Sequence, residues 1–199
     1  KPGKIRLFRK FLNPFPEEPM NMKTFLQLVY LSILSFASVA YAEIQTQEID
    51  YTQNGTTLKG YLAYDDAIKG KRPGILVVHE WWGHNEHARD RARMLAQIGY
   101  TALAVDMYGN GKTADHPKKA GEFMNAAFKD WKTSKARFNK AKEVLQAHKT
   151  VNPEQIGAIG FCFGGAVSIR MARGGADLDG IVAFHSALPL EPAITNMKA

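Results

Sequence analysis

The stretch Gly160-Phe161-Cys162-Phe163-Gly164-Gly165 decides how the rest of the chain is interpreted. It follows an apolar run at 155–159 that is typical of a strand, and it precedes a run at 166–172 that is typical of a helix. A strand that turns sharply into a helix holds the residue at the turn in a strained, protruding position, and flanking glycines remove side chains that would collide there. The pattern is G-x-S-x-G with cysteine in place of serine, which puts Cys162 at the turn.

Strands and helices are expected to alternate on both sides of this stretch. Continuous apolar runs indicate strands buried on both faces, as in a parallel sheet, and they occur at 75–78, 101–105 and 180–184. Helical spacing predicts helices between Asn85 and Gly99, at 118–128 and at 131–148, and Asn152-Pro153 is expected to break the chain before the next strand. Alternating segments at 45–51 and 57–64 flank Asn54-Gly55, a strong hairpin signal. The sequence therefore predicts an α/β fold with a mostly parallel, doubly wound sheet and an N-terminal antiparallel hairpin.

Polar residues follow the predicted buried strands. His79 and Glu80 end the first, Asp106 ends the second, Cys162 follows the third, and His185 with Ser186 follows the last. In such sheets functional groups gather at the carboxyl ends of the strands. We therefore expect the site to lie at that edge.

The chemistry expected at this edge is that of a thiolate nucleophile. Cys162 precedes a helix whose first amides are unsatisfied and whose dipole favours negative charge, and both effects stabilise a thiolate. The amide of Phe163 would point at the oxyanion of a tetrahedral intermediate, and a second donor is expected from the amide of Trp81. The alternative is that Cys162 is a small buried apolar residue, as most free cysteines are.

Three motifs in order resemble the dienelactone hydrolase family of α/β-hydrolases. They are the segments at 77–83, 99–109 and 160–165, and the resemblance covers nearly all of residues 44–188. It implies a cysteine hydrolase of esters or lactones with no metal and no organic cofactor. Cys162 matches the nucleophile and Glu80 the active-site glutamate that holds the resting thiol, whereas His79 is a strand-end residue. Trp81 and Trp82 are expected to line the mouth of the pocket.

The resemblance also implies a Cys-His-Asp triad whose acid and histidine follow strands beyond the one ending at Phe184. Asp177, Asp179 and His185 come too early in the chain for these roles, and His185 is expected to be structural or pocket-lining. We therefore expect the triad Asp and His beyond residue 199, a chain truncated at its C-terminus, and a fragment that does not complete a catalytic cycle alone.

The N-terminal part of the chain predicts export. Lys23, an apolar run at 25–34 and Ala40-Tyr41-Ala42 form a signal-peptide pattern, so residues 20–42 are expected to be a cleaved signal. Residues 1–19 are interpreted as an upstream or non-native segment, and residues 43–199 as the hydrolase domain. A membrane anchor is the alternative, but the polar residues in the run favour cleavage. The domain is thus predicted to be periplasmic or secreted.

Charge and cysteine content exclude other functions. Residues 1–42 carry six basic and two acidic side chains, so the remaining 157 residues hold only +3 of the net charge of +7. Nucleic acid is therefore not the expected partner. The family resemblance implies a small-molecule ester or lactone as the partner, and the oligomeric state stays open. A single cysteine excludes a disulfide framework and argues against a thiol redox function.

A non-catalytic ligand-binding member of the same fold is the runner-up hypothesis. His84 and His87 are interpreted as solvated residues of a helix-capping turn and not as metal ligands.

Overall fold

The computed structural model describes residues 21–23, 25–27 and 43–188, and the chain divides into two compact units, 1–41 and 42–199. In the first unit, residues 22–23 and 25–27 are helical. The rest of the predicted apolar run, from residue 28 to 34, and the predicted cleavage site at 40–42 lie outside the described residues. Within the described ranges, the helices are all too short or too polar to cross a membrane.

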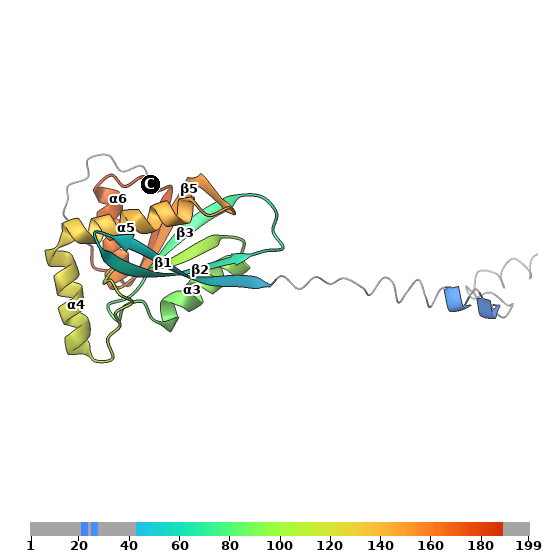
Figure 1. The fold of residues 1–199 in the computed structure, drawn as a ribbon, viewed down its shortest axis with the longest axis horizontal. Coiled ribbons are helices and arrows are strands. Elements are labelled where there is room, and N and C mark those ends of the chain that lie inside the picture. The colour runs from blue at the N-terminus through green and yellow to red at the C-terminus, as the bar shows by residue number, and fades with distance from the viewer. Residues whose placement is uncertain (1–20, 24, 28–42, 189–199) are drawn as a thin grey trace, which may run out of the picture. The chain divides into compact units, whose positions relative to one another are not determined.

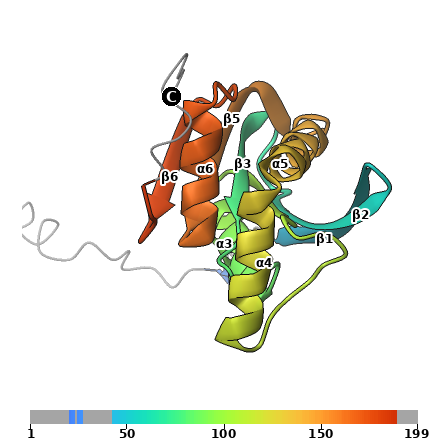
Figure 2. The ribbon, with the colours of Figure 1, turned by 90° about the vertical axis from the view of Figure 1, so that its left-hand side faces the viewer.

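The second unit is built on a six-stranded sheet with the order β1-β2-β4-β3-β5-β6. The four strands β4, β3, β5 and β6 are parallel to one another, and β1 and β2 add an antiparallel hairpin that pairs with β4 through β2. Figure 2 shows β6 at one edge of the sheet and the hairpin at the other. The predicted α/β fold with a leading hairpin is confirmed.

The hairpin forms because its two-residue turn matches the twist of its strands. β1 spans Ile44–Gln53 and β2 spans Thr56–Asp65. Between them Asn54 and Gly55 have φ values of 46° and 74°. Positive φ at both turn residues is the geometry that Asn-Gly adopts at low cost.

Helices cover both faces of the sheet, as Figure 1 shows, with α3 below the strands and α5 and α6 above them. The strands are β3 (Arg72–Val78), β4 (Thr101–Val105), β5 (Val151–Phe161) and β6 (Gly180–Phe184). The helices are α3 (Glu86–Gln97), α4 (Pro117–Lys129), α5 (Trp131–Gln146) and α6 (Phe163–Arg173). Together they make a three-layer unit.

The two faces of the sheet are packed with residues of different sizes. On one face α3 buries three alanines against Val77, Ala102 and Ala104, so that helix and sheet come close together. On the other face, bulky side chains from α5 and α6 meet the alternate strand residues, and they include Phe138, Leu145 and Met171. Each such fully buried side chain contributes about 1.5–3 kcal/mol to folding. The core is therefore concentrated under α5 and α6.

Asn85 occupies the cap position of α3, although its side chain makes no capping hydrogen bond. One detail of the sequence interpretation was wrong. Asn152-Pro153 does not break the chain before β5, because the strand begins at Val151 and runs through both residues. The β3–β5 ladder shifts register between Arg72 and Gly74, and proline is tolerated in strands at such irregularities.

Helix α6 packs onto the sheet through glycine backbone. A Cβ built on Gly164 would lie 2.2 Å from the carbonyl oxygen of Val78 and 2.6 Å from that of His79. A Cβ on Gly160 would lie 2.1 Å from the carbonyl oxygen of Gly164. The start of α6 therefore rests directly on the ends of β3 and β5, and no other residue fits at these two positions.

Replacing Gly164 with alanine tests this contact. We expect Gly164→Ala to lower the free energy of unfolding by about 3 kcal/mol or more, because the obstructing atoms are backbone and cannot rotate away. Gly121→Ala in α4 is the matched control: no atom lies within 4 Å of its built Cβ, so a gain of about 1 kcal/mol is expected. Urea denaturation measures both, and equal stability of the two variants would contradict the packing described.

Candidate active site

Three neighbouring parallel strands bring Glu80, Cys162 and His185 to the same level of the sheet. In the β3–β5 ladder Val78 is opposite Gly160, and in the β5–β6 ladder Phe161 is opposite Phe184. Continuing these registers puts Glu80 and His185 on either side of Cys162. All three residues therefore lie at the carboxyl end of the parallel strands, where the sequence predicted the site.

Cys162 occupies a strained turn between β5 and α6. Its backbone angles are φ 51° and ψ −113°, a combination that is sparsely populated for residues with a side chain and costs about 1–3 kcal/mol. Its N–H donates to the carbonyl of Phe184 at 3.0 Å, and its own carbonyl accepts from the amide of Ala166 at 3.2 Å. The half-buried thiol thus stands at the N-terminus of α6 and is fixed to the end of β6.

Glu80 forms a hydrogen bond with His185, a residue to which the sequence interpretation gave no catalytic role. His185 Nε2 lies 3.0 Å from Glu80 Oε1, and the glutamate side chain is only 23% exposed. His185 also has a positive φ of 40°, in the region that non-glycine residues seldom adopt. The sequence signal available for this contact was the position of His185 directly after β6, level with Cys162.

His79 is structural, as expected for a strand-end residue. Its Nε2 accepts a hydrogen bond from the amide of Met107, so its Nδ1 carries the proton that is donated to the carbonyl of Glu80 at 2.5 Å. Burial lowers the pKa of His79 to about 4, because the charged ring would lose its hydration. Neutral His79 therefore ties the loop that carries Glu80 to the loop after β4.

Asp106 organises the loop after β4 through backbone amides. Its Oδ1 accepts from Tyr108 at 3.0 Å and Gly109 at 2.7 Å, and its Oδ2 accepts from Gly111 at 2.7 Å and Lys59 at 3.2 Å. A buried carboxylate needs this kind of compensation. Asp106 thereby serves as a loop anchor.

Tyr108 is a site residue that sequence reasoning missed. Its hydroxyl donates to the carbonyl of Trp81 at 3.1 Å, and its ring packs on Phe163 with a centroid distance of 5.4 Å. Burial raises the pKa of Tyr108, and the neighbouring Cys162 raises it further, since two negative charges would repel. The phenol therefore stays protonated beside the thiol.

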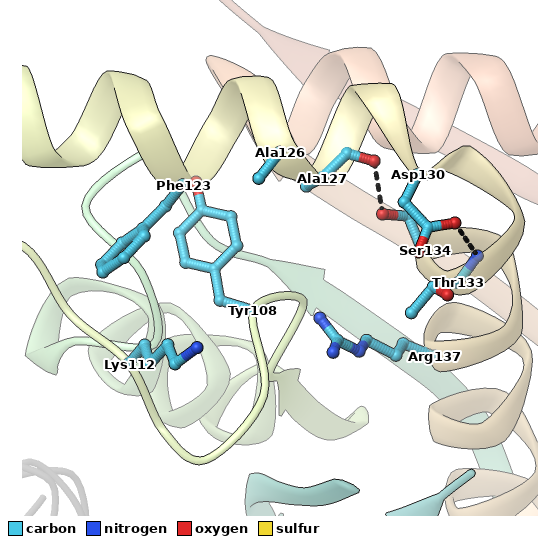
Figure 3. Close-up of a pocket in the computed structure, with 9 residues that line it drawn as sticks. All are labelled: Tyr108, Lys112, Phe123, Ala126, Ala127, Asp130, Thr133, Ser134 and Arg137. Atoms are coloured by element: carbon cyan, nitrogen blue, oxygen red, sulfur yellow. Dashed lines mark hydrogen bonds between the residues drawn. The ribbon is translucent and has the colours of Figure 1, made fainter.

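A pocket of about 280 Å³ opens next to Tyr108, between the loop after β4 and helices α4 and α5 (Figure 3). Tyr108 and Phe123 form its aromatic wall, with ring centroids 5.4 Å apart. Lys112 and Arg137 point into it, and Arg137 is held by the carbonyl of Met107 at 2.8 Å. Asp130 also lines the pocket, but its carboxylate caps α5 by accepting from the amide of Thr133. An apolar group bearing an anion would fit these surroundings.

The residues predicted for the oxyanion hole lie around the turn. Phe163 is the first residue of α6, and its buried ring stacks on His79 at 5.7 Å. Trp81 is half-buried and packs edge-on against Trp82 at 5.1 Å. The carbonyl of Trp81 is engaged by Tyr108, which fixes the orientation of this loop. The roles of the two amides stay predictions.

The expectation for His84 was wrong. His84 is buried, not solvated: its Nε2 lies 3.2 Å from the carbonyl oxygen of Ala104, and burial lowers its pKa. His87 is half-buried and stands edge-on to Phe161 at 5.4 Å. His84 lies just before α3, and the alanine face of α3 packs so closely on the sheet that the preceding turn also approaches the strands. In the part of the chain that is described, no group of three or more His, Cys, Asp or Glu side chains is placed to hold a metal ion.

The strand order, the helices on both faces and the residues at the strand ends define an α/β-hydrolase. The family model of dienelactone hydrolases matches residues 58–199. The chain belongs to the dienelactone hydrolase family.

Individual relatives agree with this assignment. The chain is 33% identical to Protein usf of Aquifex pyrophilus over 158 residues, which is 77% of this chain and 65% of the relative. Among solved structures, m3DLH is 41% identical with a TM-score of 0.71, covering 75% of this chain and 62% of that one. A dienelactone hydrolase-like promiscuous phosphotriesterase from metagenomic libraries is 37% identical with a TM-score of 0.72, covering 76% and 62%. The chain thus spans somewhat less than two thirds of these relatives.

The buried neutral His79 predicts an acid-labile fold. In the unfolded chain the His79 ring takes up a proton near pH 6.5, whereas in the folded protein the ring stays neutral down to about pH 4. The free energy of unfolding therefore decreases as the pH falls from 6.5 to 4. The loss from this group amounts to about 3 kcal/mol.

Urea denaturation across this pH range measures the effect. His79→Gln keeps a donor and an acceptor without a titratable ring, so it should reduce the slope of the pH dependence and leave the part that buried His84 contributes. His116→Gln at the exposed cap of α4 should retain the full slope. An unchanged slope in His79→Gln would contradict this assignment.

Proposed function

We propose that this protein hydrolyses carboxylic esters or lactones with Cys162 as the nucleophile. The observation that carries the proposal is the strained position of Cys162 at the junction of β5 and α6, beside Glu80, in a chain of the dienelactone hydrolase family. Strain of this kind is retained where it serves a site. The helix N-terminus favours the thiolate that attack requires.

The proposed reaction has two steps. The thiol of Cys162 loses its proton to solvent, and the sulfur attacks the carbonyl carbon to give a tetrahedral oxyanion, which the amides of Phe163 and Trp81 stabilise. Collapse of this intermediate forms a thioester and releases the alcohol, which takes up a proton from solvent. Water then cleaves the thioester to the acid and the free thiol. Glu80 accepts a hydrogen bond from the resting thiol and holds it at the turn.

The surroundings of Cys162 support an ester with an apolar body. Tyr108 lines the pocket between α4 and α5 and interacts electrostatically with Cys162, and its protonated hydroxyl adds no charge near the thiolate. Lys112 and Arg137 favour substrates that carry a negative group at the end distant from the reacting carbonyl. A small aryl ester is the simplest probe of this chemistry.

Acylation of the thiol tests the nucleophile directly. After rapid mixing with p-nitrophenyl acetate, we expect a mass increase of one acetyl group on Cys162 together with release of p-nitrophenol. Cys162→Ala should lower that release by about a hundredfold or more. Lys140→Ala, an exposed substitution on α5, is the control and should behave as the parent. Equal rates in Cys162→Ala and the parent would reject the proposal.

We also propose that the domain is exported and that residues 20–42 are removed. The apolar run after Lys23 and the Ala40-Tyr41-Ala42 site support this. Expressed in a bacterial host, the protein recovered from the periplasm should begin at Glu43, as read by N-terminal sequencing. Ala42→Arg should block processing, because the site needs small residues, whereas Tyr41→Phe should not. Cytosolic protein with an uncleaved N-terminus would contradict export.

A further inference from the structure

His185 and Glu80 meet across the end of the strand that carries Cys162. The registers of the sheet put β5 between β3 and β6, so the residues flanking Cys162 belong to different strands. Their side chains nevertheless approach to 3.0 Å, between His185 Nε2 and Glu80 Oε1. The hydrogen bond therefore joins the two residues whose strands flank the strand that ends at Cys162.

Several contacts fix His185 in this position. The carbonyl of the preceding residue, Phe184, accepts the amide of Cys162 at 3.0 Å. The following residue, Ser186, lies so close to α6 that a Cβ on Gly165 would be 2.6 Å from its Cβ. His185 itself takes a positive φ of 40°. This backbone conformation is energetically unfavourable for a residue with a side chain, and it directs the His185 ring towards Glu80.

The register of β3 and β5 places Glu80 next to Cys162. A negative charge beside a thiol opposes formation of the thiolate. A hydrogen bond donated by His185 holds the carboxylate in place and offsets part of its charge. The hydrogen bond from His185 thereby reduces the effect by which the charge of Glu80 opposes thiolate formation at Cys162.

We propose that His185 is a positioning residue that restrains Glu80 and so makes Cys162 easier to ionise. The inference rests on the proposed function, in which Cys162 is the nucleophile, but it concerns a property of the thiol that can be measured without an ester substrate. His185 acts through Glu80 and takes no proton from the thiol.

Other charged and titratable groups near this pair come from α3 and the loop after β4. The guanidinium of Arg91 lies 5.5 Å from the centre of the Phe161 ring, and the ring of His87 stands edge-on to the same phenylalanine. Phe161 in turn faces His185 at 6.4 Å, and Tyr108 is electrostatically coupled to Cys162. These groups are unchanged in every variant compared below, so their contribution cancels.

The test is the rate of alkylation of Cys162 by iodoacetamide as a function of pH. The chain has one cysteine, so the rate reports a single thiol. His185→Phe keeps an aromatic ring without a donor, and we expect alkylation at neutral pH to slow by about threefold to tenfold, with the midpoint of the profile moved to higher pH. His185→Gln keeps an N–H donor and should restore at least half of the lost rate.

A double-mutant cycle with Glu80→Gln separates positioning from a general structural effect. In the Glu80→Gln background the charge is gone, so His185→Phe should change the alkylation profile no further. Circular dichroism and urea denaturation verify that each variant is folded, and His116→Phe is the control for loss of an exposed histidine.

Three results would overturn the inference. They are an unchanged profile in His185→Phe, an equal defect in His185→Gln and His185→Phe, and an effect of His185→Phe that persists in Glu80→Gln. Failure of the proposed function looks different, because ester turnover would then be independent of Cys162 while the alkylation cycle could still show the coupling.

Discussion

The contact between the backbone of α6 and the ends of β3 and β5 is the constraint on which the site depends. Gly164 touches the carbonyls of Val78 and His79, and Gly160 touches Gly164, without any side chain in between. This contact sets the angle at which α6 leaves the sheet, and hence the direction in which Cys162 is presented. It also fixes Cys162 relative to Glu80, because both residues follow strands that the same helix start holds together.

Around the contact between α6 and the strand ends, the loops are organised by buried polar groups instead of by apolar packing. Neutral His79 connects the loop of Glu80 with that of Met107, and Asp106 collects four amides from three loop residues and β2. Each group is satisfied by specific partners, so displacing one loop would leave a buried polar atom unpaired at a cost of about 1–3 kcal/mol. The loops are therefore held in one arrangement, which positions Tyr108 beside the thiol.

Local patterns in the sequence were sufficient for the fold and for part of the site. Strands such as Thr101–Val105 and the start of α6 follow from apolar runs and glycine spacing. Cys162 was proposed from the G-x-C-x-G pattern and Glu80 from the family resemblance, and the structure places both at strand ends. The pairing of His185 with Glu80 was missed because it depends on the registers of three strands, which no short segment encodes. Burial of His84 was missed for a similar reason, since it is decided by how closely the alanine face of α3 approaches the sheet.

The backbone contact at Gly160 and Gly164 also limits how α6 can move relative to the sheet. Helix α6 cannot lift from β3 by rotating side chains, because the atoms in contact are backbone atoms on both sides. Opening at this point requires separating the helix from two central strands, which amounts to unfolding most of the core. Amide hydrogens in the first turns of α6 and at the end of β5 should accordingly exchange with solvent only through global unfolding. The strained Cys162 therefore belongs to a part of the described fold that opens only together with the core.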